Sequence, residues 1–356
     1  MRIDGFLILD KPEGIASFDV VREVKRRLGV RKAGHIGTLD PFATGVLPIA
    51  LNEGTKLIPF LNDEPKRYQG TLKLGEETAT EDHTGEVVAR RPWTEATSEA
   101  VFLAFQSFSG RIRQVPPMFS ALKVEGKPLY RLARQGLEVE RKEREVQVFE
   151  IGVEAVDLPW VRFTVSCSKG TYIRTLAKDI GRKIGCGAHL TQLRRIQSGF
   201  FSIDRAITCE ELGSLSGKPE ILRARLIPLE EALPGLPEVI GKRRLVQKVR
   251  LGQETRVRDL SPQSLSEFDR GTRVKMTYPG EGLVAILKSE MRHADIPWTD
   301  SNSVVFRSLR VFHPPSSRGG VGKDALRRDR TPHVLADAAP KPEAEGFHSK
   351  NSLSIT

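Results

Sequence analysis

The sequence has little of several features that would place a protein in a special class. Its 356 residues include three cysteines, Cys167, Cys186 and Cys209, which stand far apart without a Cys-x-x-Cys pair. That spacing argues against a disulfide framework and against a zinc site, so we expect ordinary thiols and no metal. No apolar run reaches the roughly eighteen residues that suggest a membrane span, and residues 1–5 lack the apolar stretch of a signal peptide. We therefore expect a cytoplasmic protein with no membrane partner.

What the sequence does contain is a modest excess of positive charge. Lys and Arg total 56 against 45 Asp and Glu, which gives a formal net charge of +11. Basic runs occur at residues 25–27, 31–32, 194–195 and 242–244. Each run alone is typical of a solvated helix face. The first two flank the same loop, described next, and this convergence favours a nucleic-acid partner.

That loop, residues 34–48, carries the carboxylate Asp40, with the imidazole of His35 near its start. Four residues that disfavour regular structure surround the acid. They are Gly34, Gly37, Pro41 and Gly45. The pattern predicts a loop of special backbone geometry, where functional residues concentrate. Because an Asp in a loop is more commonly a turn former or a helix cap, the assignment depends on the rest of the chain.

Residues 167–176 form a second candidate site. A predicted strand runs into Gly170 and a predicted helix begins near Thr171, so Tyr172 and Arg174 fall in its first turn, the end that favours anions. An Arg at this position is suited to pair with a carboxylate and hold it ionised. The alternative is a surface Arg beside a packed Tyr.

Two further segments have the composition of an RNA-binding site. Tyr68 follows two basic residues at the start of a strand with one polar face, where its ring could stack on an unpaired base. An ordinary strand tyrosine is the alternative. Residues 189–195 combine apolar side chains that could floor a pocket with arginines suited to phosphates.

The chain is long enough for one large domain and a small one. Strands and helices in irregular order indicate an α+β catalytic domain around a mixed, largely antiparallel sheet. Strands are predicted at residues 5–9, 46–51, 68–74, 146–156 and 161–167, with a strand or hairpin edge at 189–202. Helices are predicted at residues 17–28 with Ser17 as the N-cap, 53–61, 101–108 and 171–184. Residues 110–145, charged and carrying three prolines, are expected to form an extended insertion with a helix near residues 130–135.

A second, smaller domain is predicted after a linker at residues 233–237. Short strands are predicted at residues 246–257, 273–278, 283–288 and 304–311. The expected domains are therefore residues 1–232 and a β-rich unit at residues 238–313. Residues 314–356, dominated by Pro, Ser, Gly and charges of both signs, are expected to be a disordered tail.

Several motifs in a fixed order resemble one protein family. Residues 11–14, 34–48, 66–68, 114–123 and 170–175 together resemble the bacterial tRNA pseudouridine synthase B family, which isomerises uridine 55 in the TΨC loop. The later Tyr130 and Gly136 also fit that family's insertion. The similarity extends from about residue 5 to residue 202, and more weakly to residue 312. Any single motif could be chance, whereas five in order are highly specific.

The resemblance implies catalytic roles for three residues. Asp40 would be the nucleophile or base, Arg174 its ion-pair partner, and Tyr68 the ring stacked on a flipped uracil. Detaching uracil from the ribose and rejoining it through C5 needs no redox step, energy source or metal, so no cofactor is expected. It does need a carboxylate that can attack C1′ or C6, or take a sugar proton, in a dry pocket.

The resemblance also implies binding residues and partners. Tyr172 and Leu193 would line the uracil pocket, His35 would meet the RNA where the base has left the stack, and Lys11 with Pro12 would buttress the site. The fold would be the pseudouridine synthase fold, with an RNA-clasping insertion at about residues 110–145 and a C-terminal domain resembling the PUA module. The expected partner is the TΨC stem-loop of tRNA, bound by a monomer.

Three other readings compete with this one. The first is a relative that works inside a guide-RNA ribonucleoprotein. The first predicted strand begins almost at Met1 and the C-terminal module is compact, which disfavours it. The second is a non-catalytic module that binds or folds tRNA, against which the combination of Asp40 with Arg174 argues. The third is an acid-dependent hydrolase, for which no second carboxylate is spaced to partner Asp40.

Overall fold

A mixed sheet organises the first two-thirds of the chain. The computed structural model describes residues 3–61, 65–124, 126–215, 217–261 and 265–313, so the predicted tail at 314–356 lies outside the described residues. Within those ranges ten strands form this sheet, in the order β14-β1-β3-β12-β4-β11-β10-β7, with β2 beside β3 and β13 beside β12. Its strands are β1 (Gly5–Lys11), β2 (Ala33–His35), β3 (Thr44–Leu51), β4 (Lys66–Leu74), β7 (Gly110–Gln114), β10 (Arg144–Asp157), β11 (Trp160–Cys167), β12 (Ala188–Ser198), β13 (Phe201–Ser202) and β14 (Ile207–Thr208).

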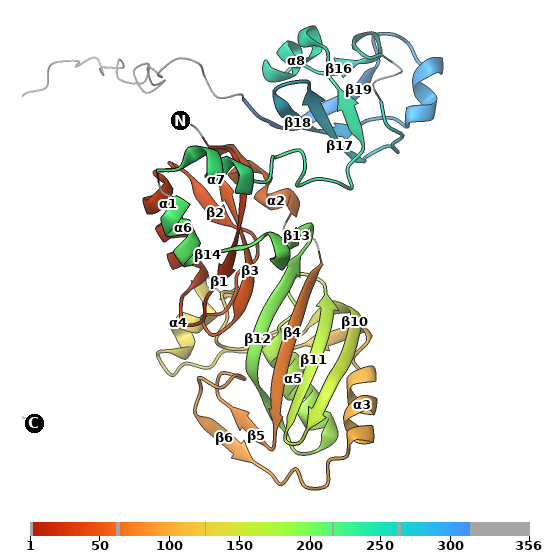
Figure 1. Cartoon of the computed structure of the whole chain (residues 1–356). Helices are drawn as coiled ribbons and strands as arrows, with labels where there is room; N and C mark the ends of the chain where they lie inside the picture. The colour runs from red at the N-terminus through yellow and green to blue at the C-terminus, as the bar shows by residue number, and fades with distance from the viewer. Residues whose placement is uncertain (1–2, 62–64, 125, 216, 262–264, 314–356) are drawn as a thin grey trace, which may run out of the picture. The chain divides into compact units, whose positions relative to one another are not determined.

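The pairing of these strands confirms the predicted α+β fold with a largely antiparallel sheet. The parallel pairs are β1 with β14 and β3 with β12, and the other pairs in this sheet are antiparallel. Figure 1 shows β12, β4, β11 and β10 running side by side, in the order that their pairing requires. The parallel contact of β12 with β3 brings the C-terminal half of β12 next to the Asp40 loop. The predicted loop at residues 34–48 includes the end of β2 and the start of β3, so its irregular part is residues 36–43.

Helices and short hairpins surround this sheet. The helices are α1 (Ser17–Leu28), α2 (Ile58–Leu61) after a 3₁₀ turn (Asn52–Leu57), α3 (Ser98–Gln106), α4 (Leu129–Ala133), α5 (Ile173–Ile184), α6 (Cys209–Leu215) and α7 (Pro219–Arg225). The hairpin strands are β5 (Glu76–Thr78) with β6 (Val87–Arg90) and β8 (Lys123–Val124) with β9 (Lys127–Pro128). α5 packs against β12 because its buried residues repeat at helical spacing. They include Ile173, Leu176, Ala177 and Ile180.

A separate five-stranded sheet follows, as the β-rich C-terminal prediction requires. Its order is β15-β17-β18-β19-β16. The elements are β15 (Glu238–Ile240), α8 (Arg243–Arg250), β16 (Thr255–Arg256), β17 (Arg273–Tyr278), β18 (Gly282–Ser289) and β19 (Val304–Val311). The predicted strand at residues 246–257 is wrong in its first part, since residues 246–250 belong to α8 and only residues 255–256 form a strand, β16. Leu245, Val246 and Val249 lie buried on one helical face, a spacing that a short apolar segment shares with a strand.

Three other predictions need local correction. α1 begins at Ser17 with Ala16 as its N-cap, so the Ser17 side chain does not cap the helix. The predicted insertion is shorter than residues 110–145, because β7 and the start of β10 pair within the main sheet. The helix in that insertion is also earlier than expected, at α4.

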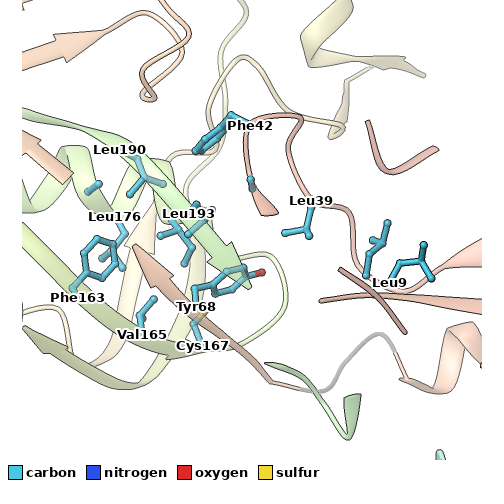
Figure 2. Packing of buried hydrophobic residues seen from close by; sticks show 14 of the residues in the cluster. Leu9, Leu39, Phe42, Tyr68, Phe163, Val165, Cys167, Leu176, Leu190 and Leu193 are labelled. Atoms are coloured by element: carbon cyan, nitrogen blue, oxygen red, sulfur yellow. The ribbon is translucent and has the colours of Figure 1, made fainter. Parts of the chain in front are cut away.

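Tyr68 lies on the buried side of β4 and not on its polar face. The strand alternates buried and exposed residues, and Tyr68 shares the buried set with Leu72 and Leu74. In Figure 2 its ring lies among the apolar side chains that include Leu193 and Cys167, and its hydroxyl points away from Phe163. The ring is therefore held by core packing while one end reaches a cavity.

Candidate active site

The backbone of the Asp40 loop is fixed by its approach to β12. Gly45 has φ +99°, and a Cβ there would lie 2.2 Å from the carbonyl oxygen of Arg195. Gly37 also has a positive φ, of 68°. Since other residues rarely adopt such angles and Gly45 has no room for a side chain, this part of the loop requires glycine.

Two side chains from the N-terminal elements hold the loop on its other side. The Ser17 hydroxyl donates to the carbonyl of Leu39 and accepts from its N–H, both at 2.9 Å. Lys11 is fully buried, and its ammonium donates to the carbonyls of Pro12, Ile15 and Pro41. The residues directly before and after Asp40 are therefore both tied to the protein. This agrees with the supporting role that the resemblance implies for Lys11.

Arg174 links Asp40 to two other loops. Its Nε donates to Oδ2 of Asp40 at 2.8 Å, and its two terminal nitrogens donate to the carbonyls of Thr80 and Phe119, also at 2.8 Å. The Arg174 side chain is 3% exposed, whereas Asp40 is 36% exposed. The guanidinium thus lies behind the carboxylate, which leaves one side of Asp40 accessible to a ligand.

A second carboxylate, Asp82, shares this guanidinium. Its Oδ2 lies 3.7 Å from Nη1 of Arg174, and its Oδ1 accepts from the hydroxyls of Thr80 and Thr84. Asp82 is not among the residues that line the cavity, so the expectation that no second carboxylate is placed to act with Asp40 in hydrolysis stays a prediction. Asp82 is buried behind Arg174, so it acts on Asp40 through electrostatics.

Burial raises the pKa of Asp40 above its ordinary value. The positive charge of Arg174 opposes this rise, and the negative charge of Asp82 adds to it. The expected role of Arg174 in keeping Asp40 charged is thus present, but burial outweighs it. The pKa of Lys11 is lowered to about 8, because burial lowers it by more than the nearby Asp40 carboxylate raises it. A carboxylate whose proton is held more tightly than usual is a better base in a water-poor pocket.

The carboxylate opens into a cavity of about 540 Å³. Five of the predicted site residues line it together. These are Asp40, Tyr68, Tyr172, Arg174 and Leu193. Its volume is within the range of small-ligand sites, and polar or charged residues make up most of its wall, with apolar side chains between them. The structure therefore brings together, at one cavity, residues from segments far apart in the sequence.

Tyr172 is the N-cap of α5 and does not lie in its first turn. Its N–H donates to Oε1 of Gln114 at 3.0 Å, and its carbonyl accepts from Nε2 of Gln114 at 3.2 Å. Gln114, which the sequence reasoning missed, is 2% exposed and fixes the Tyr172 backbone at the cavity wall.

Three predicted binding residues lie outside the cavity wall. Lys11 supports the loop from behind, and Pro12 is exposed beside it. His35 is the last residue of β2 and pairs with Ile49. Burial lowers the pKa of His35, and the charge of Arg195 lowers it further, so the neutral ring is favoured.

Arg195 has a different role from the predicted phosphate contact. It is 1% exposed, and its guanidinium donates to the carbonyls of Val46 and Gly37 at 2.7 and 2.9 Å. It therefore ties both ends of the Asp40 loop to β12. Arg194 is ion-paired with Asp10 at 2.7 Å.

The structure also bears on metal and membrane binding. Within the described ranges, no group of three or more His, Cys, Asp or Glu side chains is arranged to hold a metal ion. The same ranges contain no helix that is long and apolar enough to span a membrane. The three cysteines are free thiols.

Known proteins share both the sequence and the fold. Residues 25–173 match the N-terminal domain of TruB family pseudouridylate synthases, and residues 174–234 match the C-terminal domain of tRNA pseudouridylate synthase B. A protein from Geobacter sulfurreducens named tRNA pseudouridine synthase B is 45% identical, over 87% of this chain and 100% of its own length. One of the same name from Geotalea uraniireducens is 47% identical, over 81% and 92% respectively. A chain in the structure of an H/ACA RNP bound to a substrate RNA containing 2′-deoxyuridine is 28% identical, with a TM-score of 0.68 over 87% of this chain and 85% of that chain.

Proposed function

This chain belongs to the TruB family of pseudouridylate synthases, and we propose that it isomerises uridine 55 in the TΨC loop of tRNA. Conversion of uridine to pseudouridine in tRNA is the activity that its relatives at 45–47% identity are named for. The single observation that supports a catalytic site best is the ion pair of Asp40 with Arg174, which faces a cavity of about 540 Å³.

In this proposal the target nucleotide leaves the loop stack and enters the cavity. Extruding a base takes a few kcal/mol, and least for a nucleotide that is already unpaired, so a loop uridine is a suitable target. Tyr68 offers its ring as a stacking surface, and Leu193 and Tyr172 enclose the base. These side chains surround the glycosidic bond while it is broken.

Asp40 carries the chemistry. Its carboxylate attacks C1′ or C6, or takes a sugar proton, while the N1–C1′ bond breaks, the uracil turns and a C5–C1′ bond forms. The hydrogen on C5 then leaves as a proton and N1 gains a proton, so the reaction is an isomerisation. Arg174 holds the carboxylate in place and limits the rise of its pKa. Lys11, Pro12 and Ser17 keep the loop from moving as the nucleotide enters.

Other parts of the chain contact the tRNA outside this cavity. The insertion, whose part outside the main sheet is residues 115–143, lies beside the cavity through Ser120 and Ala121 and would clasp the stem-loop. Its exposed cations include Lys123, Lys127, Arg131 and Arg134. Residues 238–313 would act as a PUA-like RNA-binding domain, and His35 would meet the RNA at the gap left by the base. We propose that the enzyme acts as a monomer.

The relatives favour a stand-alone enzyme over the guide-RNA alternative. Identity to the tRNA pseudouridine synthase B proteins is 45–47%, compared with 28% to the chain from the H/ACA RNP. A binding module without activity would not require a buried guanidinium behind an accessible carboxylate.

Mapping of the modified position tests this proposal. An unmodified tRNA transcript is incubated with the protein alone, treated with a carbodiimide that marks pseudouridine, and copied by reverse transcriptase. We expect one new stop, at uridine 55, and none in a transcript with cytidine at that position. A stop at another uridine would contradict the TΨC-loop assignment. A stop that requires an added guide RNA would favour the ribonucleoprotein relative.

A further inference from the structure

Ser120 lines the cavity and carries a buried hydroxyl group that the proposed mechanism does not use. The residue is 5% exposed and lines the same cavity as Asp40. Its Oγ is buried and has no hydrogen-bond partner among the described residues. A buried hydroxyl without a partner destabilises a folded protein, and such groups are rare outside functional sites.

The peptide of Ser120 is fixed by backbone hydrogen bonds. The N–H of Ser120 donates to the carbonyl of Met118, and its carbonyl accepts from the N–H of Tyr130, both at 3.0 Å. Rotation about the Cα–Cβ bond is therefore the motion that can turn the buried Oγ toward the cavity, which the residue lines. A side chain on a peptide held in this way is well placed for a ligand.

Ser120 is also tied to the reacting carboxylate. The carbonyl of the residue before it, Phe119, accepts from Arg174 Nη2 at 2.8 Å, and Nε of the same guanidinium binds Asp40. One rigid, planar group thus sets the distance between the Ser120 peptide and the Asp40 carboxylate. Because Asp40 must reach the glycosidic bond, Ser120 lies close to the nucleotide that occupies the cavity.

We propose that the Ser120 hydroxyl is a substrate-binding group that hydrogen-bonds to a polar atom of the flipped nucleotide. The inference rests on the proposed function, since it requires a nucleotide in this cavity. Two atoms of a uridine offer the same chemistry near Asp40, the ribose 2′-hydroxyl and a uracil carbonyl. The bond forms only after the base has left the RNA stack, so it contributes to turnover more than to the initial binding of tRNA.

Ser289 provides a contrast that separates a binding role from a structural one. Its hydroxyl is also buried, but it donates to the carbonyl of Asp269 at 2.5 Å and also contacts that of Thr272. Removing it should lower the melting temperature, because buried carbonyls lose their donor. Removing the Ser120 hydroxyl deletes no bond of the free protein, so the melting temperature of Ser120→Ala should not fall.

The test measures tritium release from tRNA carrying 5-tritiated uridine, together with melting temperatures. For Ser120→Ala we expect kcat/KM about tenfold lower, mainly through kcat, which corresponds to the loss of one hydrogen bond in the transition state. We expect its melting temperature to be unchanged or higher, while that of Ser289→Ala falls. Wild-type kinetics in Ser120→Ala would overturn the inference, as would a loss of activity that follows a fall in melting temperature. Absence of release by the wild type would instead overturn the proposed function.

A second arm identifies the atom that is bound. The kcat/KM of tritium release is compared for wild type and Ser120→Ala on stem-loop RNA with 5-tritiated uridine or 5-tritiated 2′-deoxyuridine at the target position. If Ser120 binds the 2′-hydroxyl, the sugar replacement lowers kcat/KM more in the wild type than in the variant. If Ser120 binds a uracil carbonyl, the replacement lowers kcat/KM by the same factor in both proteins, and Ser120→Ala is slower on both RNAs. Equal kcat/KM of the two proteins on both RNAs would contradict any contact.

Discussion

Arg174 donates from Nε to Oδ2 of Asp40 over 2.8 Å, although 134 residues separate them in the sequence. The same guanidinium binds the carbonyls of Thr80 and Phe119, so one side chain joins three loops at the cavity. Its N–H groups lie in one plane at fixed angles, which makes Arg suited to this task and Lys unsuited. The Asp40 carboxylate is therefore oriented by the fold as a whole.

The first prediction concerns the acid limb of the pH–rate profile. Asp40 must be ionised to act, and its pKa is raised by burial and by Asp82 and lowered by Arg174. Asp82→Asn removes the nearby negative charge, so the acid limb of kcat/KM should move to lower pH. Arg174→Lys weakens the pairing with Asp40, so the limb should move to higher pH.

The two variants are controls for each other, because both change the hydrogen bonds around Asp40 but should move the acid limb of kcat/KM in opposite directions. Asn can still accept hydrogen bonds from Thr80 and Thr84, which favours correct folding of Asp82→Asn. Profiles that shift in the same direction, or not at all, would contradict the assignment of the acid limb to Asp40.

The second prediction separates the ring of Tyr68 from its hydroxyl. Stacking of a base on an aromatic ring contributes about 1–3 kcal/mol. Tyr68→Phe keeps the ring and should retain most of the turnover, whereas Tyr68→Leu should lower kcat/KM by about tenfold to a hundredfold. Single-turnover kinetics measure both. Equal losses of kcat/KM in Tyr68→Phe and Tyr68→Leu would show that the hydroxyl, and not stacking, supports turnover.

The third prediction concerns the insertion. Lys127 and Arg131 are exposed there, and each phosphate contact contributes about one to the slope of log affinity against log salt. Replacing both with Ala should weaken tRNA binding and reduce that slope by about two. The control is Lys183→Ala with Arg225→Ala, which removes two exposed cations that lie outside the insertion. An unchanged slope in the insertion variant would argue against an RNA-clasping role.

The fourth prediction links an ion pair to stability. Hydrogen bonds from Arg182 lower the pKa of Glu77, which is buried and also binds Arg91. Because this pKa is lowered on folding, the stabilisation is present above the ordinary value of 4.5 and is lost as pH falls through the lowered value. Glu77→Gln should reduce the free energy of unfolding at pH 7 by about 1–3 kcal/mol.

Urea unfolding of Glu77→Gln across pH measures this effect. The difference from wild type should shrink as pH falls below 4.5. The exposed residue Glu95, changed to Gln, should differ from wild type by less than about 0.5 kcal/mol. A deficit in Glu77→Gln that is constant with pH would mean that the lost interaction is not ionic.

Strong local signals account for what the sequence predicted correctly. The glycines and proline around Asp40 indicated a shaped loop, and the apolar spacing of α5 placed Arg174 at its N-terminal end. The alternation of residues along β4 predicted the strand correctly. It did not predict that Tyr68 lies on the buried side, because a tyrosine is suited to either face of a strand.

Residues that depend on long-range contacts were missed. Asp82 bonds to Thr80 and Thr84 in its own turn, so its sequence context is that of a turn former. Its proximity to Arg174 arises only when the turn after β5 packs against α5. Arg195 carries a charge that indicates exposure, yet carbonyls of the Asp40 loop satisfy its N–H groups in the interior. Arg174 is far from Asp82 in the sequence, and the Asp40 loop is far from Arg195.

The central claim is that the Asp40 carboxylate performs the isomerisation. Its most direct test is tritium release from tRNA carrying 5-tritiated uridine, comparing wild type with Asp40→Asn, which preserves size and shape. We predict release by the wild type and none by the variant above background, with the affinity of both proteins for tRNA remaining similar. Release by Asp40→Asn at a rate near that of the wild type would contradict the account.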